Sequence, residues 1–96
     1  MIGLHQVRRG VQEEVIFAEG HLEIHPHTSV VYIDLQNTAS LTVGGGRDGQ
    51  IVVVEIAPRI NTYTLTLSLD TPLVLNSTNP AALLWRRAGE WSGRVL

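Results

Sequence analysis

Histidine and glutamate side chains alternate along one short segment, which holds most of the groups in this sequence that could do chemistry. The segment reads Glu19-Gly20-His21-Leu22-Glu23-Ile24-His25-Pro26-His27. In an extended strand alternate residues project to one face, so the two glutamates and three histidines would share a face opposite Leu22 and Ile24. Imidazoles two residues apart can bind one metal ion, which makes His25 and His27 the candidate metal ligands.

The same segment is also typical of the solvated face of an edge strand, where charges and a proline oppose pairing with another sheet. We favour this interpretation, because His5 lies in an expected N-terminal arm and no histidine follows His27. We therefore expect no metal and no cofactor. Metal binding or proton sensing near an oligomer axis is the alternative.

The His25-Pro26-His27 element resembles the first motif of the cupins, which are metal-binding jelly rolls. A cupin carries a glutamate shortly after the second histidine, where this sequence has Val31 and Tyr32. A cupin also carries a distal histidine, and none is present here. A minimal cupin-like metal-binding protein is thus a minor alternative.

A glycine-rich segment, 44–49, formally satisfies the dinucleotide-binding pattern G-x-G-x-x-G. That pattern binds a pyrophosphate only where it opens a helix, and a valine-rich strand follows here instead. Gln50 and Ile51 stand where a phosphate loop needs Lys and Ser or Thr. We predict a loop, with Asp48-Gly49 as a hairpin turn joining a strand at 41–43 to one that begins at Gln50.

Other catalytic arrangements are weak. Asp34, Glu55 and Asp70 fall in separate predicted strands, and no serine lies in a G-x-S-x-G elbow. A chain of 96 residues also has little room for a ligand pocket inside its own core. We predict that the protein is not an enzyme.

Two tryptophans flank a predicted C-terminal hairpin that turns at Ala88-Gly89. They could form a cross-strand aromatic contact that closes the core, or they could anchor a neighbouring subunit together with nearby arginines. The interface candidates are Arg8, Arg9, Trp85, Arg86, Arg87 and Trp91.

Composition limits the class of protein. The chain has 44% hydrophobic residues, no cysteine and a formal net charge of −2, so it can form a core, lacks disulfides and shows no nucleic-acid footprint. Its apolar stretches are far shorter than the roughly 20 residues that cross a bilayer, and its first residues lack a secretion signal. We predict one β domain, 11–96, after an arm at 1–10, with neither nucleic acid nor membrane as a partner.

Hydrophobic residues alternate with polar ones nearly everywhere, as in 31–36 and 63–69. Residues 11–18 are ambiguous, but their Val, Ile and Phe content favours a strand. Turn residues recur every eight to twelve positions or so, which predicts an all-β fold of about seven or eight strands, an antiparallel β-sandwich or a jelly-roll-like barrel. Segments 51–56 and 81–85 are apolar on both faces, and from this we predict a homotrimer.

Three segments carry a further resemblance: 48–54, which begins Asp-Gly-Gln, the Thr-rich 63–67, and 85–91, which has the form W-x-x-x-G-x-W. They resemble small β-structural proteins and fibre-end domains of tailed-phage virions. The resemblance implies a homotrimer without enzymatic activity that is attached to a capsid shell or carried on a fibre.

A short chain that starts at Met1 and stops at Leu96 fits a head decoration (cement) protein better than the end of a long fibre. The expected partners are copies of itself and the major capsid protein or other virion proteins, and the expected location is the virion, assembled in the host cytoplasm. A fibre or spike tip that binds a receptor or glycan is the alternative.

Overall fold

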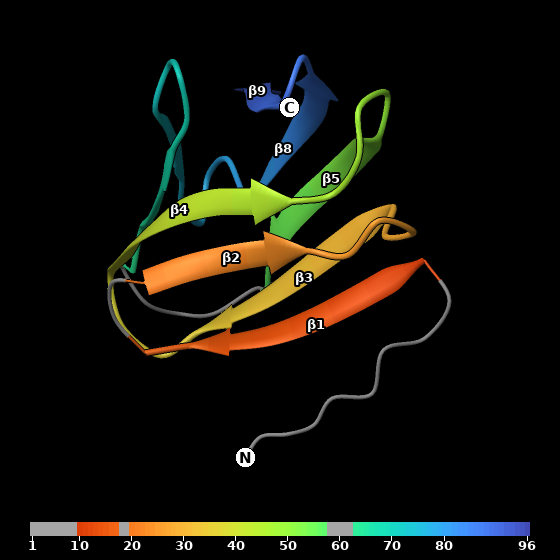
Figure 1. The fold of residues 1–96 in the computed structure, drawn as a ribbon. Coiled ribbons are helices and arrows are strands. Elements are labelled where there is room, and N and C mark those ends of the chain that lie inside the picture. Colours follow the sequence, from red (N-terminus) through yellow and green to blue (C-terminus); the bar gives the residue numbers. More distant parts are fainter. Residues whose placement is uncertain (1–9, 18–19, 58–62) are drawn as a thin grey trace.

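The structure, a computed structural model, describes residues 10–17, 20–57 and 63–96, and every regular element among them is a strand (Figure 1). The strands are β1 (Val11–Ile16), β2 (Gly20–Ile24), β3 (Val30–Leu35), β4 (Ala39–Gly45), β5 (Ile51–Ile56), β6 (Leu65–Ser68), β7 (Leu73–Leu75), β8 (Ala81–Arg87) and β9 (Glu90–Val95). They form a five-stranded sheet in the order β1-β3-β5-β8-β9 and a four-stranded sheet in the order β2-β4-β6-β7. The predicted all-β class is confirmed, with two sheets that face each other.

The chain changes sheet after each of its first five strands. Each of the strands β3 to β6 therefore lies beside the strand two before it in the sequence and runs parallel to it. β1, β3 and β5 pair in parallel in one sheet, and β2, β4 and β6 pair in parallel in the other. The last three strands then add antiparallel, β7 on β6, β8 on β5 and β9 on β8. The result is a mixed sandwich.

The predicted antiparallel pairing is therefore wrong for the first six strands, and the sheets do not close into a jelly-roll-like barrel. Period-two patterning tells which side chains point inward, but not the direction of the neighbouring strand. Asp48-Gly49 is likewise not a hairpin turn, because β4 and β5 lie in different sheets. The glycines at 45, 46 and 49 have positive φ, and this connection carries the chain from one sheet to the other.

Individual strands agree well with the patterning. The ambiguous segment 11–18 contains β1, and the doubly apolar segment 51–56 is the central strand of its sheet. The described residues contain nine strands, against the seven or eight expected. Residues 1–9 of the predicted arm lie outside the described residues.

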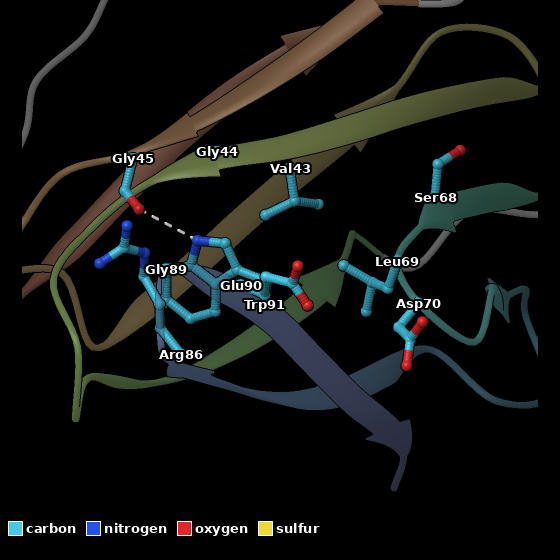
Figure 2. Close-up of a pocket in the computed structure, with 10 residues that line it drawn as sticks. All are labelled: Val43, Gly44, Gly45, Ser68, Leu69, Asp70, Arg86, Gly89, Glu90 and Trp91. Atoms are coloured by element: carbon cyan, nitrogen blue, oxygen red, sulfur yellow. Dashed lines mark hydrogen bonds between the residues drawn. The ribbon is translucent and has the colours of Figure 1, made fainter.

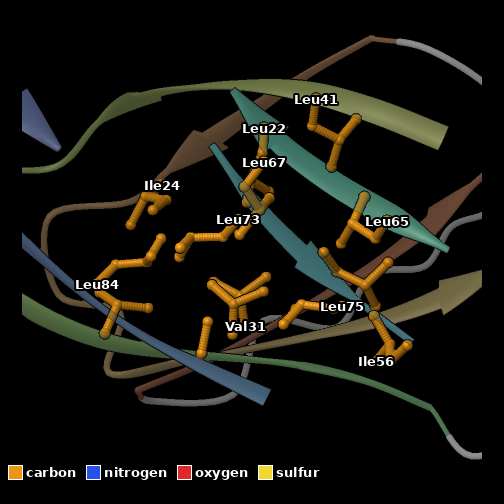
Figure 3. Packing of buried hydrophobic residues seen from close by; sticks show 14 of the residues in the cluster. Leu22, Ile24, Val31, Leu41, Ile56, Leu65, Leu67, Leu73, Leu75 and Leu84 are labelled. Atoms are coloured by element: carbon orange, nitrogen blue, oxygen red, sulfur yellow. The ribbon is translucent and has the colours of Figure 1, made fainter. Parts of the chain in front are cut away.

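Inward-facing aliphatic side chains from both sheets form one core between them (Figure 3). The odd positions of 63–69 supply Leu65 and Leu67, which are fully buried, as the alternation predicted. The other fully buried aliphatic side chains are Leu22, Ile24, Val31, Ile33, Leu41, Val52, Val54, Leu75, Ala82 and Leu84. Burial of these side chains is the main source of stability for the domain.

At the β1 edge of the five-stranded sheet, polar side chains replace aliphatic ones on the inner face of β1. Gln12 is only 1% exposed, and its Nε2 donates to the backbone oxygen of Glu23 at 2.7 Å. Its Oε1 accepts from the backbone nitrogen of His25 at 3.2 Å and from the hydroxyl of Thr28 at 3.1 Å. One side chain of β1 thus holds the end of β2 and the start of the connection to β3.

Gln50, just before β5, holds the other side of the same connection. Its Nε2 donates to the backbone oxygens of His25 at 2.9 Å and Thr28 at 2.7 Å, while its Oε1 accepts from the backbone nitrogen of Arg47. Among the described residues no buried side-chain nitrogen or oxygen is left without a partner. The two glutamines satisfy backbone groups that the tight connection would otherwise leave unpaired.

The described parts of the chain contain no helix of the length and apolarity needed to cross a lipid bilayer.

We expect Gln12→Leu to lower the free energy of unfolding by about 2 kcal/mol, because it removes the hydrogen bonds to Glu23, His25 and the buried Thr28 hydroxyl. The measurement is urea unfolding followed by circular dichroism. The same change at Gln36, a half-buried residue outside this network, is the control and should cost much less. Equal effects of the two changes would show that the network contributes nothing specific.

Candidate functional site

The histidine-rich segment lies at the edge of the four-stranded sheet, where β2 is the outermost strand. Leu22 and Ile24 are buried while His21 and Glu23 are exposed, as expected for the solvated face of an edge strand. That prediction is confirmed for the strand itself. Glu19 lies outside the described residues.

His25 and His27 do not continue the strand. β2 ends at Ile24, and the backbone nitrogen of Thr28 donates to the oxygen of His25 at 3.0 Å, which closes a turn around Pro26. The expectation that both histidines align with His21 is therefore wrong, because the chain must reverse here to reach β3. Among the described residues no three His, Cys, Asp or Glu side chains are grouped as a metal ion requires.

His21 instead makes a small cluster across β2 and β4. Its Nδ1 lies 2.6 Å from the Thr42 hydroxyl and its Nε2 lies 2.8 Å from Oε1 of Glu23. A Cβ built on Gly44 would come within 2.8 Å of the imidazole, so the ring lies directly against that glycine. The side chains of His21 and Glu23 are 50% and 64% exposed, and an ion pair this open to water contributes about 1 kcal/mol at most.

A surface pocket of about 330 Å³ lies beside the end of β4, lined by residues of both sheets (Figure 2). Its floor includes Trp91, whose indole nitrogen donates to the backbone oxygen of Gly45 at 3.0 Å. The carboxylates of Asp70 and Glu90 lie at the pocket together with Arg86, whose guanidinium also bonds Asp48 at 2.9 Å. The arrangement suits a small polar ligand.

Sequence reasoning did not find this pocket, because its polar side chains come from distant segments. Asp70 follows β6 and Glu90 begins β9, and the two-sheet fold alone brings them to one end of the molecule. The only local signal was the glycine-rich segment. A Cβ on Gly46 would come within 2.5 Å of the Trp91 ring, so that glycine admits the indole.

The predicted C-terminal hairpin is confirmed, with Ala88 and Gly89 at φ 53° and 80° in the turn. Trp85 pairs with Ser92 and Trp91 pairs with Arg86, so the two indoles lie on opposite faces of the sheet. The prediction of a cross-strand contact between the two tryptophans is therefore wrong. Trp91 is 5% exposed in the core, whereas Trp85 is half-buried on the outer face.

The other interface candidates also differ in their exposure and contacts. Arg87 is exposed near Trp85, whereas Arg86 is held by Asp48, which also accepts from the backbone nitrogen of Gly89 at 2.9 Å. Arg8 and Arg9 lie outside the described residues. Ile51, directly opposite Trp85 on β5, is 60% exposed and extends the apolar surface around that indole.

No protein-family model, curated protein or solved structure matches this chain.

We expect Trp91→Phe to destabilise the domain by about 2 kcal/mol, since it removes a hydrogen bond and leaves a cavity in the core. Trp85→Phe is the matched control, and it should change the stability of the single chain by about 0.5 kcal/mol or less, because its ring lies on the outer face. Thermal unfolding at low protein concentration measures both. The reverse order of the two effects would contradict the assignment of faces.

Replacing His25 and His27 together by threonine should change the free energy of unfolding by less than about 0.5 kcal/mol, because both side chains are exposed and only the backbone of His25 bonds the glutamines. Melting temperatures at pH 5 and pH 8, with and without a chelator, give the measurement. A pH or chelator effect present in the parent protein and lost in this variant would support metal binding or proton sensing.

Proposed function

We propose that this protein is a non-enzymatic structural protein of a tailed-phage virion, a capsid decoration protein that assembles as a trimer on the outer surface of the head shell. Its partners are copies of itself and the major capsid protein. Its place is the virion, assembled in the host cytoplasm.

The observation that supports this proposal is the set of exposed apolar side chains on the outer face of the five-stranded sheet. Ile51 is 60% exposed and Val15 is 44% exposed, and half-buried Trp85 lies beside Ile51. The same sheet already buries its inner face against the four-stranded sheet. Exposed apolar residues spread over several strands of one face are typical of a surface that another protein covers.

The construction of the domain also suits an assembly role. The strand β1, with its polar inner face, forms one edge of the five-stranded sheet. The antiparallel strands β7, β8 and β9 lie at the opposite edges of the two sheets. The W-x-x-x-G-x-W hairpin supplies one indole to the core and one to the outer face. These features favour a small rigid body that carries an attachment surface.

A second candidate is a fibre or spike tip that binds a receptor or glycan, and the pocket in Figure 2 favours it. Carboxylates such as Asp70 and Glu90 can accept hydrogen bonds from sugar hydroxyls. The double variant Asp70→Asn, Glu90→Gln should abolish glycan binding in this case. It should leave attachment to a head shell unchanged if the protein is a decoration protein.

For the decoration proposal, we expect the purified protein to cosediment with empty phage heads that lack it and to saturate at a fixed ratio to the major capsid protein. The heads must come from the phage whose genome encodes this chain. Heads of an unrelated phage are the control and should not bind it. Failure to bind the homologous heads across micromolar concentrations, or binding to isolated tails only, would contradict the proposal.

A further inference from the structure

One row of side chains crosses the outer face of the five-stranded sheet at a single level. The strand register aligns Val11 with Val30, Val30 with Val53, Val53 with Leu83, and Leu83 with Arg94. Four neighbouring strands thus present aliphatic side chains in a line, and β9 ends it with an exposed arginine. A second apolar pair, Ile51 and Trp85, lies two residues away on β5 and β8.

The two edges of this face differ in charge. On β1, Glu13 follows Val11 on the outer face and is exposed, and Asp34 lies on the outer face of β3 next to Val15. On β9, Arg94 is exposed at the level of Val11. The face is therefore acidic toward β1 and basic at Arg94 on β9, with the aliphatic row between them, while Glu55 lies two residues beyond Val53 on the outer face of β5.

We propose that this face is the contact between copies of the chain, and that three copies form a closed ring with their five-stranded sheets toward a threefold axis. This inference rests on the proposed function, since it names the surface that makes the trimer. In such a ring the β9 edge of each copy lies beside the β1 edge of the next. Arg94 then approaches Glu13 of the neighbour, while the aliphatic row lines the axis.

The dimensions of the sheet fit three copies. Five strands and the gap to the next copy span about five spacings of about 4.8 Å, or about 24 Å, and a triangle with sides of about 24 Å has its centre about 7 Å from each side. Packed sheets lie about 10 Å apart, so each contributes a layer of side chains about 5 Å thick. Three such layers fill the triangle without a large channel.

The charges of Arg94 and Glu13 also fit the three corners, the places where the β9 edge of one copy meets the β1 edge of the next. Arg94 and Val11 share one level, and Glu13 lies two residues, or about 6.6 Å, farther along its strand. An arginine side chain spans that distance. A face-to-face pair of copies would cover the apolar row as well, but it would leave the β1 and β9 edges open, whereas the ring covers the face and both edges.

Native mass spectrometry and light scattering of the purified protein test the inference directly. We expect three chain masses at micromolar concentration. Val53→Glu, at the centre of the row, should give a folded monomer by circular dichroism. Thr66→Glu on the outer face of the four-stranded sheet is the matched control and should stay trimeric. A dimer, a monomer at all concentrations, or a trimeric Val53→Glu variant would overturn the proposal.

A charge exchange tests the corner contact without touching the apolar row. Glu13→Arg and Arg94→Glu should each weaken the trimer at least about tenfold, because each places like charges together at the corners. The double variant should recover most of the loss. Two single losses that add in the double variant would overturn the β1–β9 contact, even if the protein is trimeric.

The two proposals can fail separately. Trimers that respond to Val53→Glu and to the charge exchange, but that do not bind homologous heads, would contradict the decoration function alone. A protein that binds heads while its trimer ignores these substitutions would contradict the interface alone.

Discussion

Two buried glutamines hold the connection by which the chain passes from β2 in one sheet to β3 in the other. The β2–β3 connection makes one backbone hydrogen bond of its own, from Thr28 to His25, and further backbone groups would cost about 1–3 kcal/mol each if they were buried unpaired. Gln12 and Gln50 bond the backbone of the β2–β3 connection from opposite sides. With that connection held, β3 lies parallel to β1 and β4 lies parallel to β2, and the remaining strands add to an established pair of sheets.

The elements could be predicted from the sequence, but their partners could not. Alternation identified the inward positions of β3 and β6, and Leu65 and Leu67 are buried as it predicted. Alternation looks the same in a parallel and an antiparallel strand, so it does not tell which strands pair. The segment at Asp48-Gly49 was therefore predicted as a hairpin, although it connects the two sheets. A glutamine at an inward position of β1 was the available signal for an unusual site, since an uncharged amide is seldom buried unless it serves the backbone.

The two candidate sites differ in how strongly the sequence indicates them. The histidine segment has a strong composition signal, but a turn at Pro26 separates His25 and His27 from the strand that holds His21. The pocket at Trp91 has almost no sequence signal, because Asp70 and Glu90 meet only through the arrangement of the two sheets. Local patterns predict which face a side chain takes within one strand, and a site built from several strands needs the register as well.

The two tryptophans show how one hairpin serves both the fold and its exterior. The two-residue turn at Ala88-Gly89 sets Arg86 opposite Trp91 and Trp85 opposite Ser92, so one indole enters the core while the other remains outside. If both strands were turned by one residue the two indoles would exchange places, and Arg87 and Arg94 would face the core in place of aliphatic neighbours. The core contact of Trp91 with Gly45 therefore also determines which residues the outer face presents. The register of β8 and β9 therefore decides both which side chains enter the core and which lie on the outer face of the sheet.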